Sequence, residues 1–408
     1  MILIPEVSNV APTGNSLKNY RRKKKILDLL YHEDSLSATE ISKRIGVSVP
    51  TSISLLKELG KDELVEMQGT GPSRGGRRPA MFGLKSDSIF VVSCELGRYT
   101  GKVGIFDAHN QLVSPIVKFN TSIDDEDLIE KIESEVNKIV KDKNIDTKNI
   151  YGVGLSMPGL IDENLGINYT IKDEKLQDVA QRIRERFDRL VYVNNDARMQ
   201  AYGEFIFGAA KGHQNALVVN WNWGLGLGLI LDGELYSGAT GFAGEFSHIK
   251  FVEDGDLCIC GKRGCLETVS SVYVLIRQAQ EAVKNGKISQ LTTKFKGKES
   301  EITVNDIIQS ARSGDEFSIG LLNSVGTAVG KALANAIQLL NPDVIVLGGV
   351  VSAAKQFIQT PVQQSIQRHS LEQISGNIKL VISENWEKSG LLGTTAMLFQ
   401  KLFSNMYN

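Results

Sequence analysis

The stretch GFAGEFSHIKFVEDGDLCICGKRGCLE, from Gly241 to Glu267, determines how the whole sequence is interpreted. It holds three of the four cysteines of the chain, and a histidine precedes the first of them by ten residues. Together the four side chains offer one imidazole and three thiols, the ligand set of a closed, structural zinc site. These candidate ligands are His248, Cys258, Cys260 and Cys265. Gly261 and Gly264 would let the chain fold tightly around an ion, and the alternative is three free cysteines that happen to cluster.

Two carboxylates belong to the same stretch, because Glu245 precedes the histidine by three residues and Glu267 follows the last cysteine by two. A metal that ties His248 to the cysteines would draw both carboxylates to one side of a pocket. The runs GFAGEFSH and CICGKRGCLE resemble the signature of the ROK family, which comprises sugar kinases and sugar-responsive repressors. The resemblance implies that Glu245, His248 and Glu267 contact sugar hydroxyls. One departure is Ser247, where the family usually has glycine.

The length and composition indicate a soluble globular protein with two or three domains, since the chain has 408 residues, 42% of them hydrophobic and 23% charged. We expect no membrane segment, because no apolar run reaches the length needed to span a bilayer. Residues 1–16 do not resemble a signal peptide. We therefore expect a cytoplasmic protein, in which thiols stay reduced and can bind metal.

The charge is unevenly distributed along the chain. Residues 1–85 carry 14 Lys and Arg against 9 Asp and Glu, a net charge of +5, whereas the remainder, with 32 against 38, has a net charge of −6. This asymmetry is expected of a chain in which only the N-terminal part meets nucleic acid.

The pattern after a mobile arm at residues 1–16 is typical of a helix-turn-helix. The basic run Lys18–Lys25 leads into a first helix. Ser37, followed three residues later by Glu40, predicts a capping box for a second helix that ends at Gly46. Ser48 then begins a third helix, with Pro50 in its first turn and apolar positions at Ile53, Leu55, Leu56 and Leu59. Two short helices joined by a tight glycine turn predict a DNA-binding motif.

The candidate DNA contacts come from the third helix and from the wing, which we define as Leu64–Leu84. The exposed helix face is predicted to show Thr51, Ser52, Ser54 and Lys57, side chains that can bind base edges or phosphates. The basic tip of the wing carries Arg74, Arg77 and Arg78, which suit a narrow minor groove. Its GGRRP run resembles the wing of ROK repressors, and the alternative is a three-helix module that binds protein.

Two further motifs resemble the sugar-contacting loops of the family. The run IYGVGLSMPGLID implies that Pro158 and Gly159 line the sugar pocket. The run VYVNNDARMQ implies that Asn195 contacts the sugar and that Asp196 corresponds to the general base of the kinases. Taken alone, the NDA run would favour Asp196 as a helix N-cap.

The loops that hold ATP phosphates in ROK kinases differ in this sequence. Asp, Gly and Thr of the first loop are replaced within Glu95–Tyr99, where Arg98 and Tyr99 add bulk. The second loop, Trp223–Gly226, lacks the threonine of the family, although close strand packing explains an apolar Gly-x-Gly run equally well. Both changes argue against phosphoryl transfer. Gly348 and Gly349 resemble the adenosine-side loop and leave ATP binding open.

The resemblance implies an α/β chain of the actin-like, ribonuclease H-like sugar kinase type with two lobes, preceded by a winged helix-turn-helix. We expect the DNA-binding domain at 17–85, the first lobe at 86–197, the second at 198–387, and a C-terminal helix at 388–405 that packs on the first lobe. Local patterns also predict helices at 125–140 and 321–340 and a hairpin turn at Asp232-Gly233.

The leading functional hypothesis is a sugar-responsive transcriptional repressor with a structural Zn²⁺. It would bind double-stranded operator DNA as a homodimer or homotetramer. One alternative is an ATP-dependent hexose kinase with an appended DNA-binding domain and Asp196 as its base. The other is a protein-interaction module built on an inactive kinase fold.

Overall fold

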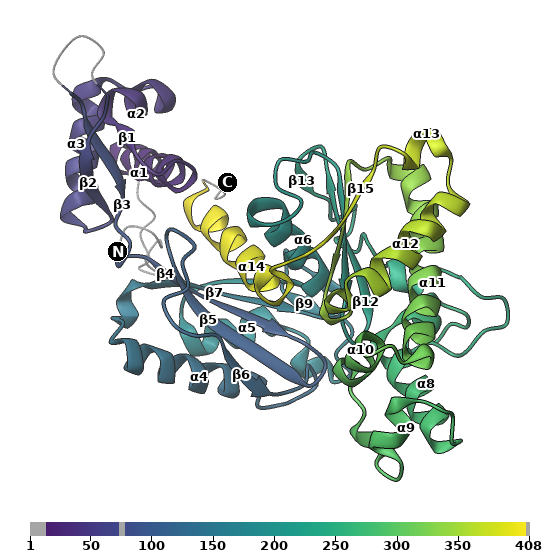
Figure 1. Ribbon diagram of the computed structural model, residues 1–408. Helices are drawn as coiled ribbons and strands as arrows, with labels where there is room; N and C mark the ends of the chain where they lie inside the picture. Colours follow the sequence, from purple (N-terminus) through teal and green to yellow (C-terminus); the bar gives the residue numbers. More distant parts are fainter. Residues whose placement is uncertain (1–13, 73–77, 405–408) are drawn as a thin grey trace. The chain divides into compact units, whose positions relative to one another are not determined.

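The computed structural model describes residues 14–72 and 78–404 (Figure 1). Most of the expected mobile arm lies outside these ranges, as do Arg74 and Arg77 of the wing. The chain divides into two compact units. Unit 1 comprises the described residues up to Ser156, Glu163–Val193 and the described residues from Thr394 onward, and unit 2 comprises Met157–Asp162 and Asn194–Gly393.

Unit 1 begins with three helices and a small antiparallel sheet in the order of a winged helix. The elements are α1 (Asn15–His32), β1 (Leu36–Ser37), α2 (Ala38–Ile45), α3 (Val49–Lys61), β2 (Val65–Thr70) and β3 (Ala80–Leu84). Strand β3 lies between β1 and β2. The three helices and the two wing strands confirm the sequence-based prediction, which missed the two-residue β1 and assigned Asn15 and Ser16, the first residues of α1, to the arm.

The helix boundaries follow from caps that the sequence already showed. The Ser37 hydroxyl accepts a hydrogen bond from the Glu40 amide, and the Glu40 carboxylate accepts one from the Ser37 amide, at 3.3 and 2.9 Å. Gly46 ends α2 in the left-handed region at φ 69°, where glycine meets no steric penalty. Ser48 caps α3, and Pro50 lies in its first turn. All three predictions are confirmed.

Replacement of Ser37 by alanine should destabilise α2 by about 1 kcal/mol, because it removes one half of the capping box. Hydrogen exchange at the α2 amides should become about fivefold faster. Ser54→Ala is the matched control, since Ser54 is exposed within α3 and caps no helix. Unchanged exchange in Ser37→Ala would contradict the cap assignment.

The α/β part of unit 1 is built on a five-stranded sheet with the order β10-β7-β4-β5-β6. Its strands are β4 (Phe90–Leu96), β5 (Thr100–Asp107), β6 (Val117–Asn120), β7 (Ile150–Met157) and β10 (Leu190–Asn195). Strands β4, β5 and β6 form an antiparallel meander, and β7 runs parallel to β4. The helices are α4 (Leu128–Lys143) and α5 (Val179–Phe187). Helix α4 begins later than expected because the Asp125 carboxylate accepts from the Ser122 amide and closes a turn before it.

The C-terminal helix α14 (Trp386–Phe403) lies against β7 in unit 1. A Cβ at Gly154 would come within 2.8 Å of Leu398 Cδ1. The glycine in the strand therefore allows close packing of the helix.

Unit 2 repeats the same strand arrangement in a second five-stranded sheet, β13-β12-β11-β14-β15. Its strands are β11 (Ala216–Trp221), β12 (Leu225–Leu231), β13 (Glu234–Leu235), β14 (Val344–Gly348) and β15 (Lys379–Ile382). Again a three-stranded antiparallel meander is followed by parallel strands. The predicted turn between β12 and β13 is confirmed, with Asp232 at φ 54° and Gly233 at φ 79°, as a type I′ hairpin requires. The repeated sheet is that of the expected actin-like fold.

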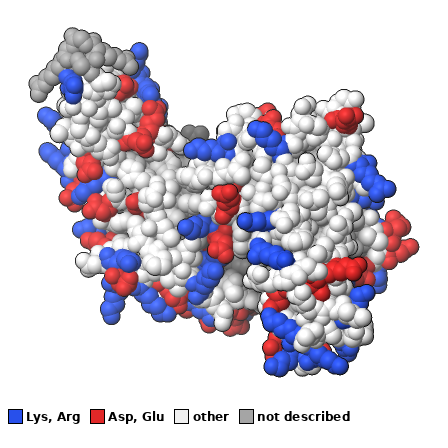
Figure 2. All heavy atoms as spheres, in the orientation of Figure 1, with Lys and Arg blue, Asp and Glu red and all other residues white. Residues whose placement is uncertain are grey.

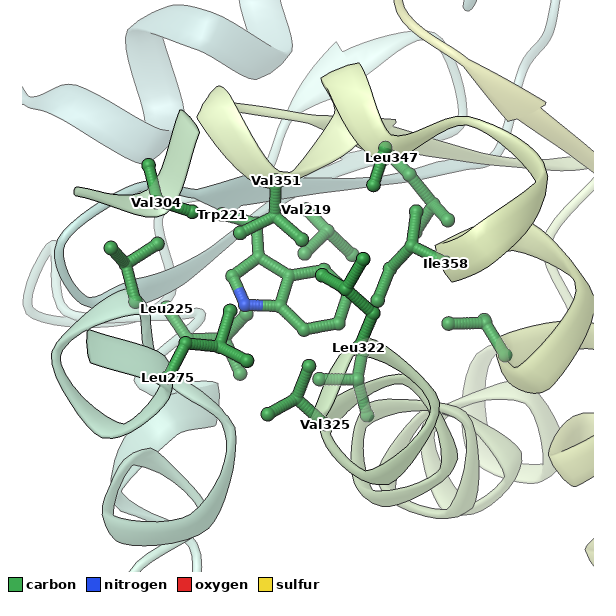
Figure 3. Packing of buried hydrophobic residues seen from close by; sticks show 14 of the residues in the cluster. Val219, Trp221, Leu225, Leu275, Val304, Leu322, Val325, Leu347, Val351 and Ile358 are labelled. Atoms are coloured by element: carbon green, nitrogen blue, oxygen red, sulfur yellow. The ribbon is translucent and has the colours of Figure 1, made fainter. Parts of the chain in front are cut away.

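The large core of unit 2 surrounds Trp221, which is fully buried (Figure 3). Its ring lies among Val219, Leu225, Leu275 and Val351 (Figure 3), and its indole N–H donates to the Ser270 carbonyl at 2.7 Å. The helices of this unit are α6 (Asp196–Phe207), α7 (Glu267–Ser270), α8 (Val272–Lys284), α9 (Gln290–Phe295), α10 (Val304–Arg312), α11 (Glu316–Leu340), α12 (Gln356–His369) and α13 (Glu372–Ser375). Short elements complete the fold: β8 (Ile161–Asp162), β9 (Ile167–Asn168), and the 3-10 helices Thr147–Asn149, Glu174–Leu176, Phe246–His248, Glu299–Glu301 and Val350–Ala354.

Helix α11 corrects one sequence-based expectation. Within the part of the chain that the structure describes, it alone is long and apolar enough to cross a membrane by length and composition. Over half of its apolar window, 56%, is buried inside the protein. The helix packs against α12, α8 and α10 (Figure 1), which is the environment of a buried core helix.

Candidate DNA-binding, metal and effector sites

The four candidate metal ligands come together in unit 2. One ligand atom from each of His248, Cys258, Cys260 and Cys265 lies within 4.8 Å of all the others. His248 Nδ1 is 3.6 Å from Cys258 Sγ, and the Sγ atoms of Cys260 and Cys265 are also 3.6 Å apart. A tetrahedral ion with metal–sulfur distances of about 2.3 Å places its ligands about 3.7 Å apart. The residues therefore fit a structural metal ion.

The cysteine loop is shaped by two glycines with left-handed backbone angles. Gly261 follows Cys260 at φ 83°, and its amide donates to the Cys258 carbonyl at 2.9 Å. Gly264 precedes Cys265 at φ 74°, where a Cβ would collide with the Val252 carbonyl oxygen. Both turns bring the thiols to one side of the loop, as the sequence suggested.

Two of the three thiols, Cys258 and Cys265, ionise less readily than a free thiol, whereas hydrogen bonds outweigh burial at Cys260 and lower its pKa. Burial raises the pKa of Cys258 to about 12 and also raises the pKa of Cys265. Because metals bind thiolates, metal binding would release protons, and the affinity would fall as the pH falls.

The imidazole of His248 joins the cysteine cluster to two carboxylates. Its Nδ1 is on the side of Cys258 and lies 3.8 Å from Glu267 Oε2, whereas its Nε2 lies 4.0 Å from Glu245 Oε2. A metal on Nδ1 would leave Nε2 available to another ligand. Burial raises the pKa of Glu245. The three side chains remain partly exposed, so a polar molecule could reach them.

Asn195 and Asp196 have different roles from those that the isolated NDA run favoured. Asn195, rather than Asp196, is the N-cap of α6: its Oδ1 accepts from the amides of Ala197 and Arg198 at 2.9 and 3.3 Å. The amide group of Asn195 also donates to the Gly159 carbonyl at 3.2 Å, which brings the Pro158–Gly159 loop to the start of α6. The alternative role of Asp196 as the helix cap is thereby contradicted, because the cap bonds depend on the path by which β10 enters the helix.

Asp196 belongs to a chain of side-chain amides. Its Oδ2 accepts from Asn220 Nδ2 at 3.0 Å, Asn220 Oδ1 accepts from Asn222 Nδ2 at 2.6 Å, and Asn222 Oδ1 accepts from the Val350 amide at 2.9 Å. This series of hydrogen bonds holds the carboxylate of Asp196, at the start of α6, against Asn220 of β11. Spacing alone could not have revealed these contacts, since their members are far apart in sequence.

Arg198 is a further residue that the sequence analysis missed. It is almost completely buried, and its Nη1 donates to Asn194 Oδ1 at 3.1 Å. Its positive charge favours the ionised form of Glu245, against the effect of burial. Arg198 thereby links the α6 residues electrostatically to the group around His248. No sign of this burial was visible in the sequence, because a charged residue in the first turn of a helix that also contains Asp196 is not unusual.

The glycines of β12 have a packing role. A Cβ at Gly226 would lie 2.6 Å from the Ala197 Cβ, and one at Gly228 would lie 2.7 Å from the Ala197 carbonyl oxygen. These glycines allow α6 to pack closely on β12. Gly224 faces Glu267 instead, with only 2.8 Å between an added Cβ and Oε1.

The hairpin turn between β4 and β5 contains bulky side chains that interact with each other. Arg98 Nε donates to the Tyr99 hydroxyl at 2.9 Å. Glu95, near the end of β4, forms an ion pair of 3.0 Å with Lys102. Gly97 closes the turn by donating its amide to the Thr100 carbonyl at 2.8 Å.

The exposed face of α3 differs partly from the prediction. Ser54 and Lys57 are exposed, and the Thr51 hydroxyl is 2.8 Å from that of Ser48. Ser52, however, is completely buried, and Ile53 is 40% exposed, so both placements were wrong. The helical period puts Ser52 on the face of Leu55, Leu56 and Leu59, and Ile53 on that of Lys57. The spacing of the leucines could have indicated this rotation.

Arg78 is the wing arginine that falls within the described ranges, and it is exposed. Figure 2 shows basic and acidic side chains mixed over the visible face of the described residues. The described residues form no continuous basic patch on this face, so the candidate DNA contacts are single side chains on α3 and the wing.

A winged helix-turn-helix joined to a duplicated actin-like α/β fold defines the class of this protein. Comparison with family models agrees: residues 21–66 match the winged helix-turn-helix DNA-binding model, and residues 91–401 match the ROK family. The chain belongs to the ROK family.

Individual relatives include regulators and an enzyme. The xylose repressor of Caldicellulosiruptor bescii is 28% identical over 390 residues, which cover 93% of this chain and 95% of the repressor. A glucokinase of Halalkalibacterium halodurans is 32% identical over 251 residues, 60% of this chain and 75% of the enzyme. Among solved structures, a ROK family transcriptional regulator described as a homolog of E. coli MLC has a TM-score of 0.78 at 25% identity, covering 94% of this chain and 97% of that chain.

Proposed function

We propose that this protein is a cytoplasmic transcriptional repressor whose affinity for operator DNA is set by a bound sugar. The observation that carries the proposal is the presence of both modules in one chain, a winged helix and a ROK body, along nearly the full length of a xylose repressor. Ligand-controlled repressors require such a pairing, because the sugar must shift the balance between two states that differ in DNA affinity.

The effector sugar binds next to a structural zinc ion. His248, Cys258, Cys260 and Cys265 hold the zinc, and the metal fixes the imidazole so that Nε2 meets a sugar hydroxyl. Glu245, Glu267 and Asp196 accept hydrogen bonds from other hydroxyls, as carboxylates do. Asn195, Pro158 and Gly159 complete the pocket. The geometry around His248 and the start of α6 supports this arrangement.

The DNA contacts come from Thr51, Ser54 and Lys57 of α3 and from Arg74, Arg77 and Arg78 of the wing. The helix enters a major groove, and the arginines follow the adjacent minor groove. The protein acts as a homodimer or homotetramer, because symmetric operators are read by pairs of recognition helices.

Replacement of Lys57 by alanine should weaken binding to operator and to unrelated DNA alike, because an exposed lysine on α3 would neutralise one phosphate. The slope of log affinity against log salt concentration should fall by about 1. Lys138→Ala, on α4 of the α/β part, is the matched charge control. An unchanged slope in Lys57→Ala would remove this residue from the interface.

A second candidate function, phosphorylation of a hexose with Asp196 as the base, is favoured by the similarity to a glucokinase. Three features oppose it: the ion pair of Glu95 with Lys102, the bulk of Arg98 and Tyr99 in the hairpin, and the absence of the family's threonine near Trp223. The protein is therefore a regulator without kinase activity. Sugar-dependent formation of ADP from ATP, lost in Asp196→Asn, would overturn this assignment.

The decisive experiment is fluorescence anisotropy of the protein on DNA from upstream of its own and neighbouring genes. Xylose, glucose and N-acetylglucosamine are titrated in turn, with and without ATP. We expect tight, salt-sensitive binding that one sugar alone alters. No specific DNA binding, together with ATP consumption in the presence of a sugar, would establish the enzyme instead.

A further inference from the structure

We propose that helix α14 transmits the state of the effector site to the winged helix through the side chain of Tyr31. This coupling rests on the proposed function above. Helix α14 is shared between the two units: Trp386–Gly393 belong to unit 2 and Thr394–Phe403 to unit 1. Because its backbone is hydrogen-bonded throughout, an α-helix of 18 residues moves as a rod about 27 Å long.

The unit 2 half of α14 packs on α6 with the two backbones in contact. A Cβ at Gly203 of α6 would collide with the Ser389 carbonyl oxygen, and a Cβ at Gly393 of α14 would collide with the Met199 carbonyl oxygen. No side chain lies between the helices here to absorb a shift. Since α6 begins at Asn195 and Asp196, a change at the effector site that moves α6 must also move α14.

A buried carboxylate also holds α6 against α14. Glu204, near the end of α6, is almost completely buried. Its Oε1 accepts hydrogen bonds from the hydroxyls of Ser383 and Ser389, and its Oε2 accepts from the Ala209 amide at 2.9 Å. Such a fully hydrogen-bonded buried group resists separation of the elements that it joins.

The unit 1 half of α14 carries two stacked aromatic rings that meet the winged helix. Phe399 and Phe403 have ring centroids 5.7 Å apart, and the ring of Tyr31 lies 5.1 Å from the first and 5.6 Å from the second. The Tyr31 hydroxyl donates to Asn110 Oδ1 at 2.8 Å, in the turn after β5. Figure 1 shows α1 beside the C-terminal end of α14.

These contacts position the winged helix rather than fold it. The interior of the winged helix is filled by other residues of α1, namely Ile26, Leu27 and Leu30. Tyr31 instead bonds to segments outside the winged helix. Helix α1 packs on α2 and α3, so the orientation of Tyr31 helps to set that of the DNA-reading helix. The coupling requires two arrangements of α14 that the sugar and the operator favour differently.

The experiment compares wild type, Tyr31→Ala and Tyr31→Phe by measuring the operator Kd with and without the effector sugar. Calorimetry gives the sugar Kd, and circular dichroism gives the folded state. In wild type the sugar should change the operator Kd by about 5- to 150-fold. In Tyr31→Ala the ratio of the operator Kd with sugar to the operator Kd without sugar should approach one, while the sugar Kd is unchanged. Tyr31→Phe, which keeps the ring, should retain most of the wild-type response of the operator Kd to sugar. Asn110→Ala should behave like Tyr31→Phe, because it removes the same hydrogen bond.

The outcomes separate this inference from the function on which it rests. A wild-type ratio in Tyr31→Ala would overturn the transmission through α14 and leave the repressor function intact. A wild-type protein whose operator binding ignores every sugar would overturn the repressor function, and the coupling with it. A weakened sugar Kd in Tyr31→Ala would also overturn the inference, because a purely transmitting residue leaves the sugar site unaffected.

Discussion

Replacement of Cys265 by alanine is expected to remove the metal and, with it, the response to sugar. Cys265 is one of the buried thiols of the cluster, so its loss leaves three ligands for a closed site that needs four. Without the ion, His248 is no longer held between the cysteine loop and the carboxylates. Isolated zinc fingers gain about 10–16 kcal/mol from metal binding, and we therefore expect the loop of residues 249–265 to unfold.

Elemental analysis of protein prepared without added metal measures this effect directly. Wild type should contain about one zinc per chain and Cys265→Ala almost none. Operator binding in the absence of sugar should persist, because the winged helix is in unit 1 and the cluster in unit 2. Cys94→Ala is the matched control: Cys94 is a buried thiol of β4, and its loss should leave the zinc content unchanged. A zinc-free wild type would refute the metal site.

Replacement of Glu245 by alanine should abolish the response of operator binding to sugar while the affinity for DNA itself is retained. Each hydrogen bond from a sugar hydroxyl to this carboxylate is worth about 1.5–3 kcal/mol. Loss of one such bond should therefore weaken the sugar affinity roughly tenfold to hundredfold. The carboxylate lies on the Nε2 side of His248, away from the cysteines. Its loss should therefore leave the zinc content unchanged.

The measurement is the operator Kd in a sugar titration, together with the zinc content. Glu253→Ala is a matched control, because Glu253 is a strongly exposed carboxylate eight residues further along the chain, near the cysteine loop. It should respond to sugar like wild type. If Glu245→Ala keeps the full response, the pocket must lie elsewhere and the roles of Glu267 and Asp196 fall with it.

The family of this protein and the clustering of its four candidate metal ligands could be predicted from the sequence because both depend on residues close together in the chain. The His and Cys ligands occur within eighteen residues, from His248 to Cys265, and two glycines suffice to gather them. The same holds for the caps at Ser37 and Gly46 and for the Asp232-Gly233 turn. In each case one or two local hydrogen bonds, or a left-handed backbone angle, select the structure without help from distant residues.

What the sequence did not reveal depends on elements that meet only in the folded chain. Helix α3 is rotated by the packing of its leucines, which buries Ser52 and exposes Ile53. The path of β10 into α6 makes Asn195 the cap, and the glycines of β12 serve the approach of α6. The contacts of Tyr31 with Phe399 and Phe403 join residues at opposite ends of the sequence. The sequence by itself determined the local turns, the caps and the cluster of candidate metal ligands, whereas the tertiary structure decided which faces are buried and which distant side chains meet, because packing optimises all contacts of a unit together.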